Sequence, residues 1–561
     1  MGKYAIGIDF GTLSARALIA EIGTGREAAQ AVMDYPHGVM DRALPDGTPL
    51  PSDWALQHPG DYLACLERII PEAIGRAGIS AADIVGVGID ATTCTLIPVD
   101  RDGTPLYMLP GLEGEKHAYA KLWKHHAAQK YADAMTETAR ERDEAFLTRC
   151  GGRVSSEWLF PKVWQMLEEA PALYARTDRF IDAADWIVLQ LTGCEARSSC
   201  LAGYKAFWNA RDGYPSDSFF AALDPRLQHV VDEKLSRRVQ PVCTRAGFVT
   251  ERAARLTGLR AGTAVAVGTS DAHVAPPAAG ITETGRMLMI MGTSTVHLVL
   301  DGAWHDAPGI CGAVKDGIVP GLIGYEAGQC CVGDHFDWFV KNGVPEAYAR
   351  EAAARGLDLY ALLTEKAARM APGESGLVAL DWWNGNRSVL VDAGLSGVLM
   401  GLTLATRPEE IYRALIEATA FGTRVIVENF EAHGLALSDI VACGGIARKN
   451  AFFMQVYADV LGREIRVAKS AQTAALGSAL MGAVAAGEAA GGYDGIGRAA
   501  AEMGGLLEAR YAPDPAAHAV YDRLYAEYLR LHDWFGRGGS DAMKRLKNIR
   551  EAAPSGRRGR K

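Results

Sequence analysis

The sequence predicts an α/β fold made of two related domains that face each other across a cleft. Three observations lead to this prediction. The chain has 561 residues, 49% of them hydrophobic, which is enough for two cores rather than one oversized core. A strand, a Gly-Thr turn and a second strand open the chain at residues 4–22. The same unit returns at residues 286–300, so we expect an internally duplicated chain.

The first unit has a buried strand at residues 4–9 and a second strand at residues 15–22, joined by a turn at residues 10–12. Gly11 therefore lies in a hairpin. A Rossmann fingerprint or a Walker phosphate loop needs its glycines between a strand and the start of a helix. Neither pattern is present in this unit.

The remainder of the first half completes one domain. Residues 84–90 and 94–99 repeat the strand, turn, strand pattern, and a mostly helical stretch runs over residues 113–191. Strand character returns at residues 264–267, and a stretch of small residues follows it. We place the first domain at residues 1–281.

The second half restarts with strands at residues 286–291 and 295–300. A further strand is predicted at residues 439–443 and a helix at residues 474–486. That helix is rich in Ala and Gly, so it could pack closely on its neighbours. These elements belong to a second domain at residues 282–536.

A long amphipathic helix is predicted inside the second domain. Thr406 and Glu409 match a capping box, and Pro408 suits the first helical turn. Gly434 can end this helix. Beyond the second domain, residues 537–561 are basic with few apolar side chains, which indicates a flexible, solvated tail.

Composition excludes several classes of function. The net charge of -9 and the lack of a basic run in the interior argue against nucleic acid as a partner. No signal-peptide pattern opens the chain, and no apolar stretch reaches the roughly 20 residues that span a bilayer. The ten cysteines show no C-x-x-C spacing. We expect reduced thiols, a cytoplasmic location and no membrane partner.

The first hairpin offers residues for phosphate and metal binding. Glycine and hydroxyl residues at a turn let backbone N–H groups approach phosphate oxygens, and a carboxylate at a strand end can hold a hydrated Mg²⁺. The candidates are Asp9 for the metal and Gly11, Thr12, Ser14 and Arg16 for ATP. Taken alone, an ordinary β-hairpin explains this segment equally well.

Two later segments extend the candidate nucleotide site. Gly292, Thr293 and Ser294 repeat the hydroxyl-bearing hairpin, and two facing hairpins would clamp the β- and γ-phosphates from both sides. Gly444 and Gly445 could admit a flat base or ribose, with Asn450 as a hydrogen-bonding partner. By itself the third segment fits a plain strand-to-helix turn better.

The ordered motifs resemble the FGGY carbohydrate kinases over nearly the whole chain apart from the basic tail. The motifs are residues 7–12, 268–271, 292–294 and 444–450, and residues 158–164 and 396–423 resemble the two family signatures. The resemblance implies a two-domain actin-like ATPase (ribonuclease H-like) fold with an ATP cleft between the domains. It also implies ATP and Mg²⁺ as cofactors, a sugar or polyol as substrate, and a homodimer.

By this resemblance Asp271 is the general base, although an isolated Asp after Thr-Ser would more often be a turn residue. Trp123, Lys205, Asp271 and Glu326 would line the sugar site. Residues 122–126, 269–273 and 325–334 are similar to the ribulokinase branch of the family, which implies L-ribulose as substrate and L-ribulose 5-phosphate as product. D-Ribulose, ribitol and D-xylulose stay open, as do a chaperone-like ATPase and an inactive sugar-binding regulator.

Overall fold

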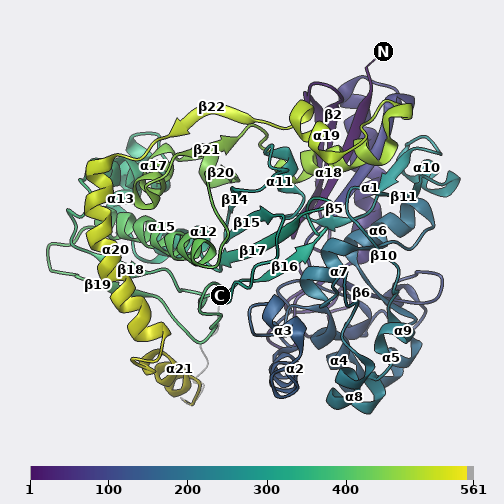
Figure 1. The fold of residues 1–561 in the computed structure, drawn as a ribbon, viewed down its shortest axis with the longest axis horizontal. Coiled ribbons are helices and arrows are strands. Elements are labelled where there is room, and N and C mark those ends of the chain that lie inside the picture. Colours follow the sequence, from purple (N-terminus) through teal and green to yellow (C-terminus); the bar gives the residue numbers. More distant parts are fainter. Residues whose placement is uncertain (1, 553–561) are drawn as a thin grey trace.

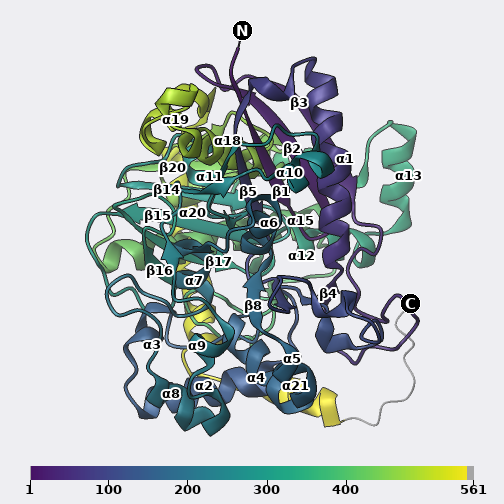
Figure 2. The same ribbon diagram turned by 90° about the vertical axis from the view of Figure 1, so that its right-hand side faces the viewer.

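The computed structural model describes residues 2–552. The chain forms two lobes, each with a mixed seven-stranded sheet and helices packed around it (Figure 1). The N lobe is built by the first half of the sequence, and the C lobe by most of the second half (Figures 1 and 2). The predicted α/β fold with two related domains is confirmed.

The N-lobe sheet has the strand order β11-β12-β5-β1-β2-β3, with β13 paired to β5. Strands β1, β2 and β3 pair antiparallel, whereas β5 runs parallel to β1, and both β12 and β13 run parallel to β5. The carboxyl ends of β1, β5 and β13 therefore meet at one edge of the sheet. The strands are β1 (Tyr4–Phe10), β2 (Ser14–Glu21), β3 (Glu27–Asp34), β5 (Ile84–Ala91), β11 (Arg245–Phe248), β12 (Ala264–Ala266) and β13 (Thr269–Ser270).

A smaller layer sits below this sheet in the N lobe. The expected hairpin after β5 does not form, because β6 (Leu96–Val99) leaves the main sheet and pairs with β7 (Ala120–Lys121) and β8 (Arg179–Asp182). β4 (Leu56–Gln57) pairs with β7, and β9 (Arg197–Ser198) pairs with β10 (Val239–Gln240).

The N-lobe helices are α1 (Pro59–Ala77), α2 (Gln129–Glu141), α3 (Ala145–Arg149), α4 (Leu159–Glu169), α5 (Pro171–Arg176), α6 (Ala183–Thr192), α7 (Ser199–Lys205), α8 (Asp217–Leu223), α9 (Val230–Lys234), α10 (Glu251–Thr257) and α11 (Ala275–Ala278).

The C-lobe sheet repeats the central arrangement of the N-lobe sheet. β14 and β15 form an antiparallel hairpin, and β20 runs parallel to β14, just as β5 runs parallel to β1. This repetition agrees with the duplication inferred from the two Gly-Thr units. The strand order is β16-β17-β15-β14-β20-β21-β22. The strands are β14 (Arg286–Met291), β15 (Thr295–Asp301), β16 (Gly312–Lys315), β17 (Ile323–Gln329), β20 (Asp439–Cys443), β21 (Ile465–Ala468) and β22 (Leu506–Tyr511).

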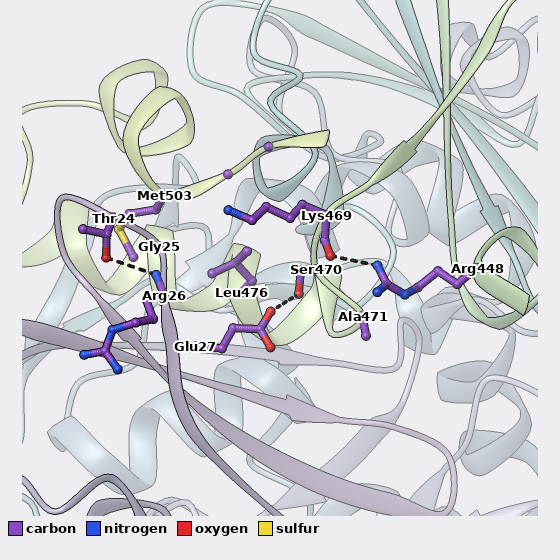
Figure 3. A pocket seen from close by; sticks show the side chains of 12 residues that line it. Thr24, Gly25, Arg26, Glu27, Arg448, Lys469, Ser470, Ala471, Leu476 and Met503 are labelled. Carbon is purple, nitrogen blue, oxygen red and sulfur yellow. Dashed lines mark hydrogen bonds between the residues drawn. The ribbon is translucent and has the colours of Figure 1, made fainter. Parts of the chain in front are cut away.

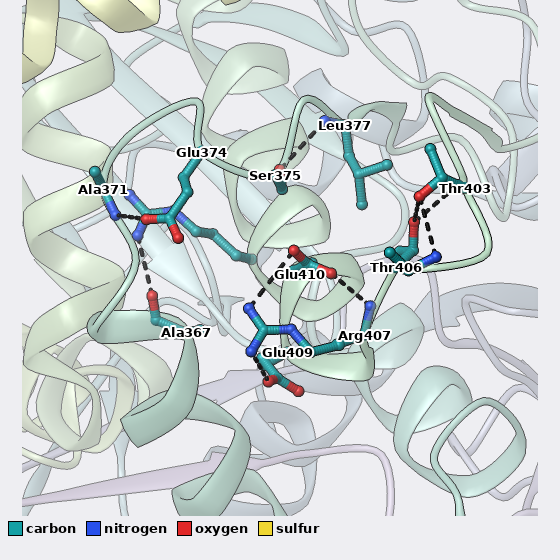
Figure 4. A network of polar contacts seen from close by, with 12 residues as sticks. Ala367, Ala371, Glu374, Ser375, Leu377, Thr403, Thr406, Arg407, Glu409 and Glu410 are labelled. Carbon is teal, nitrogen blue, oxygen red and sulfur yellow. Dashed lines mark hydrogen bonds and ion pairs between the residues drawn. The ribbon is translucent and has the colours of Figure 1, made fainter.

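Helix α15 (Pro408–Ala432) crosses the C lobe, but its predicted capping box is wrong by one residue. Pro408 occupies the first helical turn, which makes Arg407 the N-cap residue. The Arg407 backbone N–H therefore donates to Glu410 rather than to Glu409 (Figure 4). The Thr406 hydroxyl instead accepts a hydrogen bond from the Thr403 backbone N–H.

Other elements complete the C lobe. They are α12 (Gly333–Asn342), α13 (Glu346–Ala354), α14 (Leu359–Ala368), α16 (Gly445–Lys449), α17 (Ala451–Leu461), α20 (Pro515–Gly536) and the two-stranded sheet of β18 (Val378–Leu380) and β19 (Val398–Met400). The aromatic and aliphatic side chains of α15, α17 and α20 share one buried core with this lobe's sheet.

Helix α18 (Thr473–Ala486) lies between the two sheets. Cβ atoms on Gly7 or Gly88 would overlap carbonyl oxygens of α18, so glycines in β1 and β5 permit the close approach. One buried cluster joins Leu480 of α18 to Leu18 of β2 and Leu298 of β15. The predicted small-residue helix is thus a packing element shared by both lobes. Helix α19 (Ile496–Met503) packs against it.

The predicted flexible tail differs from the structure over part of its length. Residues 542–552 form helix α21 (Ala542–Ala552), Met543 is buried in the C-lobe core, and the Lys544 ammonium lies 2.6 Å from Asp392. The buried Met543 side chain and this ion pair thus hold residues 542–552 against the C lobe, although their composition alone predicted a solvated segment. Residues 553–561 of the predicted tail lie outside the described residues.

Two expectations from composition can be compared with the structure. All ten cysteines are free thiols, most of them buried. Among residues 2–552, none of the helices has both the length and the apolar character needed to cross a bilayer.

Candidate active site

Three carboxylates meet at the carboxyl-end edge of the N-lobe sheet. Asp9 is the second-last residue of β1, and the parallel register places Asp90, the second-last residue of β5, beside it. Asp271 follows β13, and its backbone N–H donates to the Ala91 carbonyl of β5 at 3.0 Å. We call Asp9, Asp90 and Asp271 the acidic edge. The sequence analysis selected Asp9 and Asp271 but missed Asp90, although Asp90 also lies near the end of a buried strand.

Burial sets the electrostatics of the acidic edge. Burial raises the pKa of Asp271 to about 6, and the neighbouring Asp9 carboxylate adds to this. Burial also raises the pKa of Asp9, whereas the Arg16 guanidinium at 3.4 Å opposes the increase. Burial and the charge of Asp9 raise the pKa of Asp90 well above its ordinary value.

The Asp90 side chain is fully buried, and only one of its two carboxylate oxygens accepts a hydrogen bond from a described residue. One of its oxygens accepts a hydrogen bond from the Ser478 hydroxyl of α18 at 2.6 Å. The other oxygen, Oδ1, has no hydrogen-bond partner among the described residues. A hard divalent cation with oxygen ligands would suit this crowded set of carboxylates.

The first hairpin, Gly11–Ser14, is held in place by hydrogen bonds from several sides. Its turn closes through the Gly11 N–H and the Ser14 carbonyl at 3.0 Å. The Tyr35 hydroxyl donates to the Gly11 carbonyl, and the Gln57 amide donates to the Thr12 carbonyl at 2.8 Å. Arg16 reaches both Asp9 and Ser14. The predicted phosphate-binding residues of this motif therefore lie together beside the acidic edge.

The second hairpin, Gly292–Ser294, is the equivalent turn of the C lobe. Its Gly292 and Thr293 carbonyls accept hydrogen bonds from the Gly333 and Val332 N–H groups at the start of α12. Gly444 has a φ of +95°, and a Cβ there would overlap the Met291 carbonyl oxygen. The glycine pair Gly444-Gly445 therefore passes directly against the strand that leads into the second hairpin.

Asn450 has two roles in folding. Its side-chain oxygen caps α17 by accepting a hydrogen bond from the Phe453 N–H at 3.0 Å. Its amide nitrogen donates to the Thr364 hydroxyl of α14 at 3.2 Å. The amide nitrogen has two N–H groups, so one donor is left that a nucleotide could use while Thr364 keeps the other.

The predicted sugar residues Lys205 and Glu326 form a buried ion pair across the two lobes. Lys205 ends α7 in the N lobe and Glu326 belongs to β17 in the C lobe, with Nζ and Oε2 2.9 Å apart. His273 Nε2 lies 3.2 Å from the same carboxylate oxygen. We call Lys205, His273 and Glu326 the interlobe cluster.

Each ionised group of the interlobe cluster stabilises the charged form of its neighbours. Burial opposes ionisation of Glu326, but Lys205 and His273 hold the pKa of Glu326 well below its usual range. Burial alone would lower the pKa of His273, whereas Cys200 and Glu326 raise it to about 9. His273 was missed as a site residue; its place two residues after Asp271 was the available signal.

Trp123 lies with the first hairpin rather than with the interlobe cluster. Its indole N–H donates to the Thr12 hydroxyl at 3.1 Å. The ring is half-buried and borders the cluster of apolar side chains in the smaller N-lobe layer. The structure therefore joins Trp123 to a phosphate-binding candidate, and Lys205 to Glu326.

Comparison with known families decides the classification. The model of the FGGY family of carbohydrate kinases, N-terminal domain, matches residues 4–276, and the model of the C-terminal domain matches residues 287–486. The chain belongs to the FGGY family of carbohydrate kinases. This confirms the family inferred from the ordered motifs, and membership implies the use of ATP.

Individual relatives agree with this FGGY assignment. The chain is 54% identical to the ribulokinase of Bacillus licheniformis, over 96% of this chain and 98% of the relative. It is 49% identical to the ribulokinase of Mycolicibacterium smegmatis, over 98% and 97%. Among solved structures, xylulose kinase from Rhodospirillum rubrum has a TM-score of 0.75 at 25% identity, covering 94% of this chain and 98% of that one. Plasmodium falciparum glycerol kinase with ADP has a TM-score of 0.76 at 15% identity, covering 94% and 98%, which shows a shared fold.

A cavity of about 380 Å³ borders the 444–450 motif through Arg448 of α16 (Figure 3). The rest of its lining comes from the turn between β2 and β3, the segment from β21 into α18, and the end of α19 with the residues that follow it. The Ser470 hydroxyl donates to Glu27 within it (Figure 3). It contains none of the predicted catalytic or binding residues.

Proposed function

We propose that this FGGY kinase transfers the γ-phosphoryl group of ATP to the 5-hydroxyl of L-ribulose, giving L-ribulose 5-phosphate and ADP. The observation that carries the proposal is the interlobe cluster, which pairs Lys205 and Glu326 beside the segment that holds Asp271. The ribulokinase relatives, at 49–54% identity over nearly their full length, support the ketopentose.

Asp271 is the general base of the proposed reaction. With a pKa of about 6 it is mostly ionised at neutral pH and still basic enough to take up a proton. The sugar oxygen forms a bond to the γ-phosphorus as the bond between that phosphorus and the ADP oxygen breaks. The hydroxyl proton passes to Asp271, and the bonding electron pair leaves with ADP.

The two hairpins position the phosphates. Gly11, Thr12 and Ser14 approach from the N lobe, and Gly292, Thr293 and Ser294 approach from the C lobe. Arg16 is held next to them by Asp9. Gly444, Gly445 and Asn450 form the adenosine side of the site. In this arrangement the protein supplies mainly orientation and charge, which is what phosphoryl transfer requires.

Asp9 would hold Mg²⁺, with Asp90 and Asp271 close by. The unpaired Asp90 oxygen and the raised pKa values of all three carboxyl groups fit a site for a hard cation. When bound, the ion would neutralise charge on the phosphates. Asp9 keeps its orientation through Arg16, and Asp90 through Ser478.

In the sugar site, Lys205 and Glu326 would hydrogen-bond hydroxyls of the ketopentose, and Trp123 would cover its C–H surface. Lys205 and Glu326 come from different lobes, so a bound sugar would be contacted from both sides. The arrangement favours a polar substrate with several hydroxyls.

A coupled ADP-release assay over L-ribulose, D-ribulose, ribitol and D-xylulose tests the substrate. We expect the highest kcat/KM for L-ribulose, by about tenfold or more over its stereoisomers, because hydroxyl geometry decides the contacts made by the interlobe cluster. A higher kcat/KM for any other member of the set would overturn the assignment to L-ribulose.

Three broader features remain part of the proposal. We infer domains at residues 1–281 and 282–536, a cytoplasmic location and a homodimer. The free thiols support a reducing compartment, and the family resemblance supports the dimer. Light scattering coupled to size-exclusion chromatography measures the oligomeric state, and a mass equal to one chain would remove the dimer.

A further inference from the structure

Arg387 is a cationic side chain near Glu326 that the reaction described above leaves without a role. It lies on the segment between β18 and β19 and is only partly exposed. Burial alone would lower the pKa of Arg387, but Cys330, Glu157, Cys311 and Glu326 around it raise the pKa. Among the described residues, no carboxylate oxygen lies within the 4.0 Å of an ion pair with its guanidinium.

The Arg387 side chain packs against Gly328 of β17. Successive side chains of a strand point to opposite faces, so Glu326 and position 328 share one face of β17. A Cβ on Gly328 would lie 3.3 Å from the Arg387 Cδ atom and 3.6 Å from Nη1. The Arg387 side chain therefore runs over Gly328, on the face that carries Glu326.

The segment next to Arg387 is fixed to the same strand. The Gly328 N–H donates to the Ser388 hydroxyl at 3.2 Å, and the Cys311 thiol lies 3.6 Å from this hydroxyl. Arg387 is consequently held in place by its neighbour rather than by an ion pair of its own.

The strand register locates Arg387 between the sugar residues and the phosphate-binding residues. Glu326 lies opposite Leu298, and Gln329 lies opposite Thr295, the residue that follows the second hairpin. From Glu326 to Gln329, β17 therefore runs towards that hairpin, and Gly328 lies between the two ends. A phosphoryl group passing from the hairpin to a sugar at Glu326 must cross this interval.

The charge of Arg387 is not needed to balance Glu326. That carboxylate already has Lys205 at 2.9 Å and His273 at 3.2 Å. A guanidinium presents planar, paired donors that match phosphoryl oxygens, and Lys cannot reproduce this geometry. Arg387 is therefore a cation that Glu326 does not need, with suitable donors, beside the stretch of β17 between Glu326 and the second hairpin.

We propose that Arg387 is a catalytic residue that donates hydrogen bonds to the oxygens of the phosphoryl group while it is transferred. This rests on the proposed kinase function. Arg387 keeps its own protons throughout; the phosphorus exchanges its bond to the ADP oxygen for a bond to the sugar oxygen, and the proton goes to Asp271. Such a contact is stronger in the transition state than with either substrate, so it acts on kcat.

The test uses steady-state kinetics of three variants, Arg387→Met, Arg387→Lys and Arg387→Ala, with ATP and L-ribulose. We expect R387M to lose about 10³-fold in kcat, with both KM values within about threefold, as for loss of a donor to a transferring phosphoryl group. R387K should recover only part of the loss. Added guanidinium ion should partly restore the kcat of R387A but not that of R387K, because only the alanine variant leaves a space for it.

Two matched variants serve as controls. Arg350→Met, on the exposed face of α13, should leave kcat unchanged. Glu157→Gln removes the N-lobe carboxylate near Arg387 and should leave kcat within about threefold. If E157Q reproduced the loss seen in R387M, the two residues would act as an ion pair between the lobes and the proposal would be wrong.

Failure of the proposed kinase function and failure of the proposed role of Arg387 give different experimental results. A wild-type enzyme that phosphorylates no pentulose overturns the proposed function and the role of Arg387 with it. A wild-type enzyme that is active, together with an R387M variant whose kcat is unchanged, overturns the role of Arg387 alone. A tenfold rise in the KM for L-ribulose in R387M with an unchanged kcat would mean that Arg387 binds the sugar before the transfer. This result would also overturn the proposed role of Arg387 in the transfer step.

Discussion

Asp271 has the environment that a general base of phosphoryl transfer needs. It lies at the end of a short strand, it is held by the Ala272 N–H at 2.8 Å and the Ser270 hydroxyl at 3.2 Å, and it faces Asp9. Burial raises its pKa while the two hydrogen bonds limit the increase. The result is a carboxylate that is ionised at neutral pH yet more basic than an exposed one.

The first prediction follows from this pKa. A base must be unprotonated to act, so kcat/KM should fall tenfold per pH unit below about pH 6. It should be constant from about pH 7 until His273, whose pKa is about 9, begins to lose its proton. Asp271→Asn should lower turnover by at least about 100-fold and remove this acidic limb. Asp102→Asn, on an exposed turn, is the control and should keep the wild-type profile. An unchanged turnover in D271N would exclude Asp271 from the mechanism.

The second prediction concerns Glu326. Glu326→Gln keeps the shape but removes the charge that Lys205 and His273 share, so we expect the KM for L-ribulose to rise at least about tenfold while the KM for ATP stays within about threefold. Glu326→Ala should also lower the melting temperature, because breaking a buried ion pair costs about 3–5 kcal/mol. A rise confined to the KM for ATP would move Glu326 to the nucleotide site.

Sequence predicts site residues only where a local motif carries them. Asp9 comes just before the turn of a recognisable hairpin, and Asp271 follows the Thr-Ser segment, so each could be selected from its own local motif. Asp90 joins them only through the register of β1 with β5. Arg387 packs over Gly328 of β17, which lies far from it along the chain. Contacts of this kind depend on which strands pair, and spacing along the chain does not encode them.

Helices and strands also follow this rule: those set by local sequence were predictable, and those set by distant pairing were not. The hairpins of β1–β2 and β14–β15 were predictable because each one is local, with its turn residues between two apolar strands. β6 was misread as the second arm of a hairpin, since its partners β7 and β8 lie far along the chain. The start of α15 was misplaced by one residue, because two Glu residues in succession fit a capping pattern and only the position of Pro408 decides between them.

Helix α4 carries a family signature whose function becomes visible in the structure. Its Lys162 is fully buried, and its ammonium donates to the carbonyls of Cys94 at 2.6 Å and Leu122 at 2.9 Å. Leu122 directly precedes Trp123, and Cys94 follows β5. One side chain of α4 thus ties together the two segments that border the N-lobe side of the cleft.

The third prediction tests this positioning role of Lys162. Lys162→Met removes the donor of the buried Cys94 carbonyl, whereas the Leu122 carbonyl keeps the His125 N–H as a donor at 3.0 Å. A buried carbonyl without a donor costs about 1–3 kcal/mol. We expect a lower melting temperature and, because the Trp123 segment loosens, a higher KM for L-ribulose with a smaller change in kcat. Lys130→Met, on the exposed side of α2, is the matched control. An unchanged KM in a destabilised K162M would mean that Lys162 supports the fold but not the site.

At the scale of the whole molecule, the two lobes meet at α18 and at the residues proposed to bind the sugar. Helix α7 of the N lobe lies against β16 of the C lobe (Figure 1). The Tyr204 hydroxyl donates to the Gly324 carbonyl at 2.7 Å, and Lys205 pairs with Glu326. The residues proposed to bind the sugar are therefore also residues that join the lobes, which couples sugar binding to the relative position of the two phosphate hairpins.

The fourth prediction draws on this coupling. If the sugar helps to align the lobes, ATP alone should leave the two hairpins imperfectly placed and water should be a poor acceptor. ATP hydrolysis without sugar should then be at least about 100-fold slower than L-ribulose phosphorylation, measured by ADP release in the same assay. Lys205→Met removes the N-lobe partner of Glu326, so in this variant we expect a sugar to accelerate ADP release far less than in the wild type. Sugar-independent hydrolysis as fast as phosphorylation would instead identify an ATPase whose cycle does not depend on a sugar acceptor.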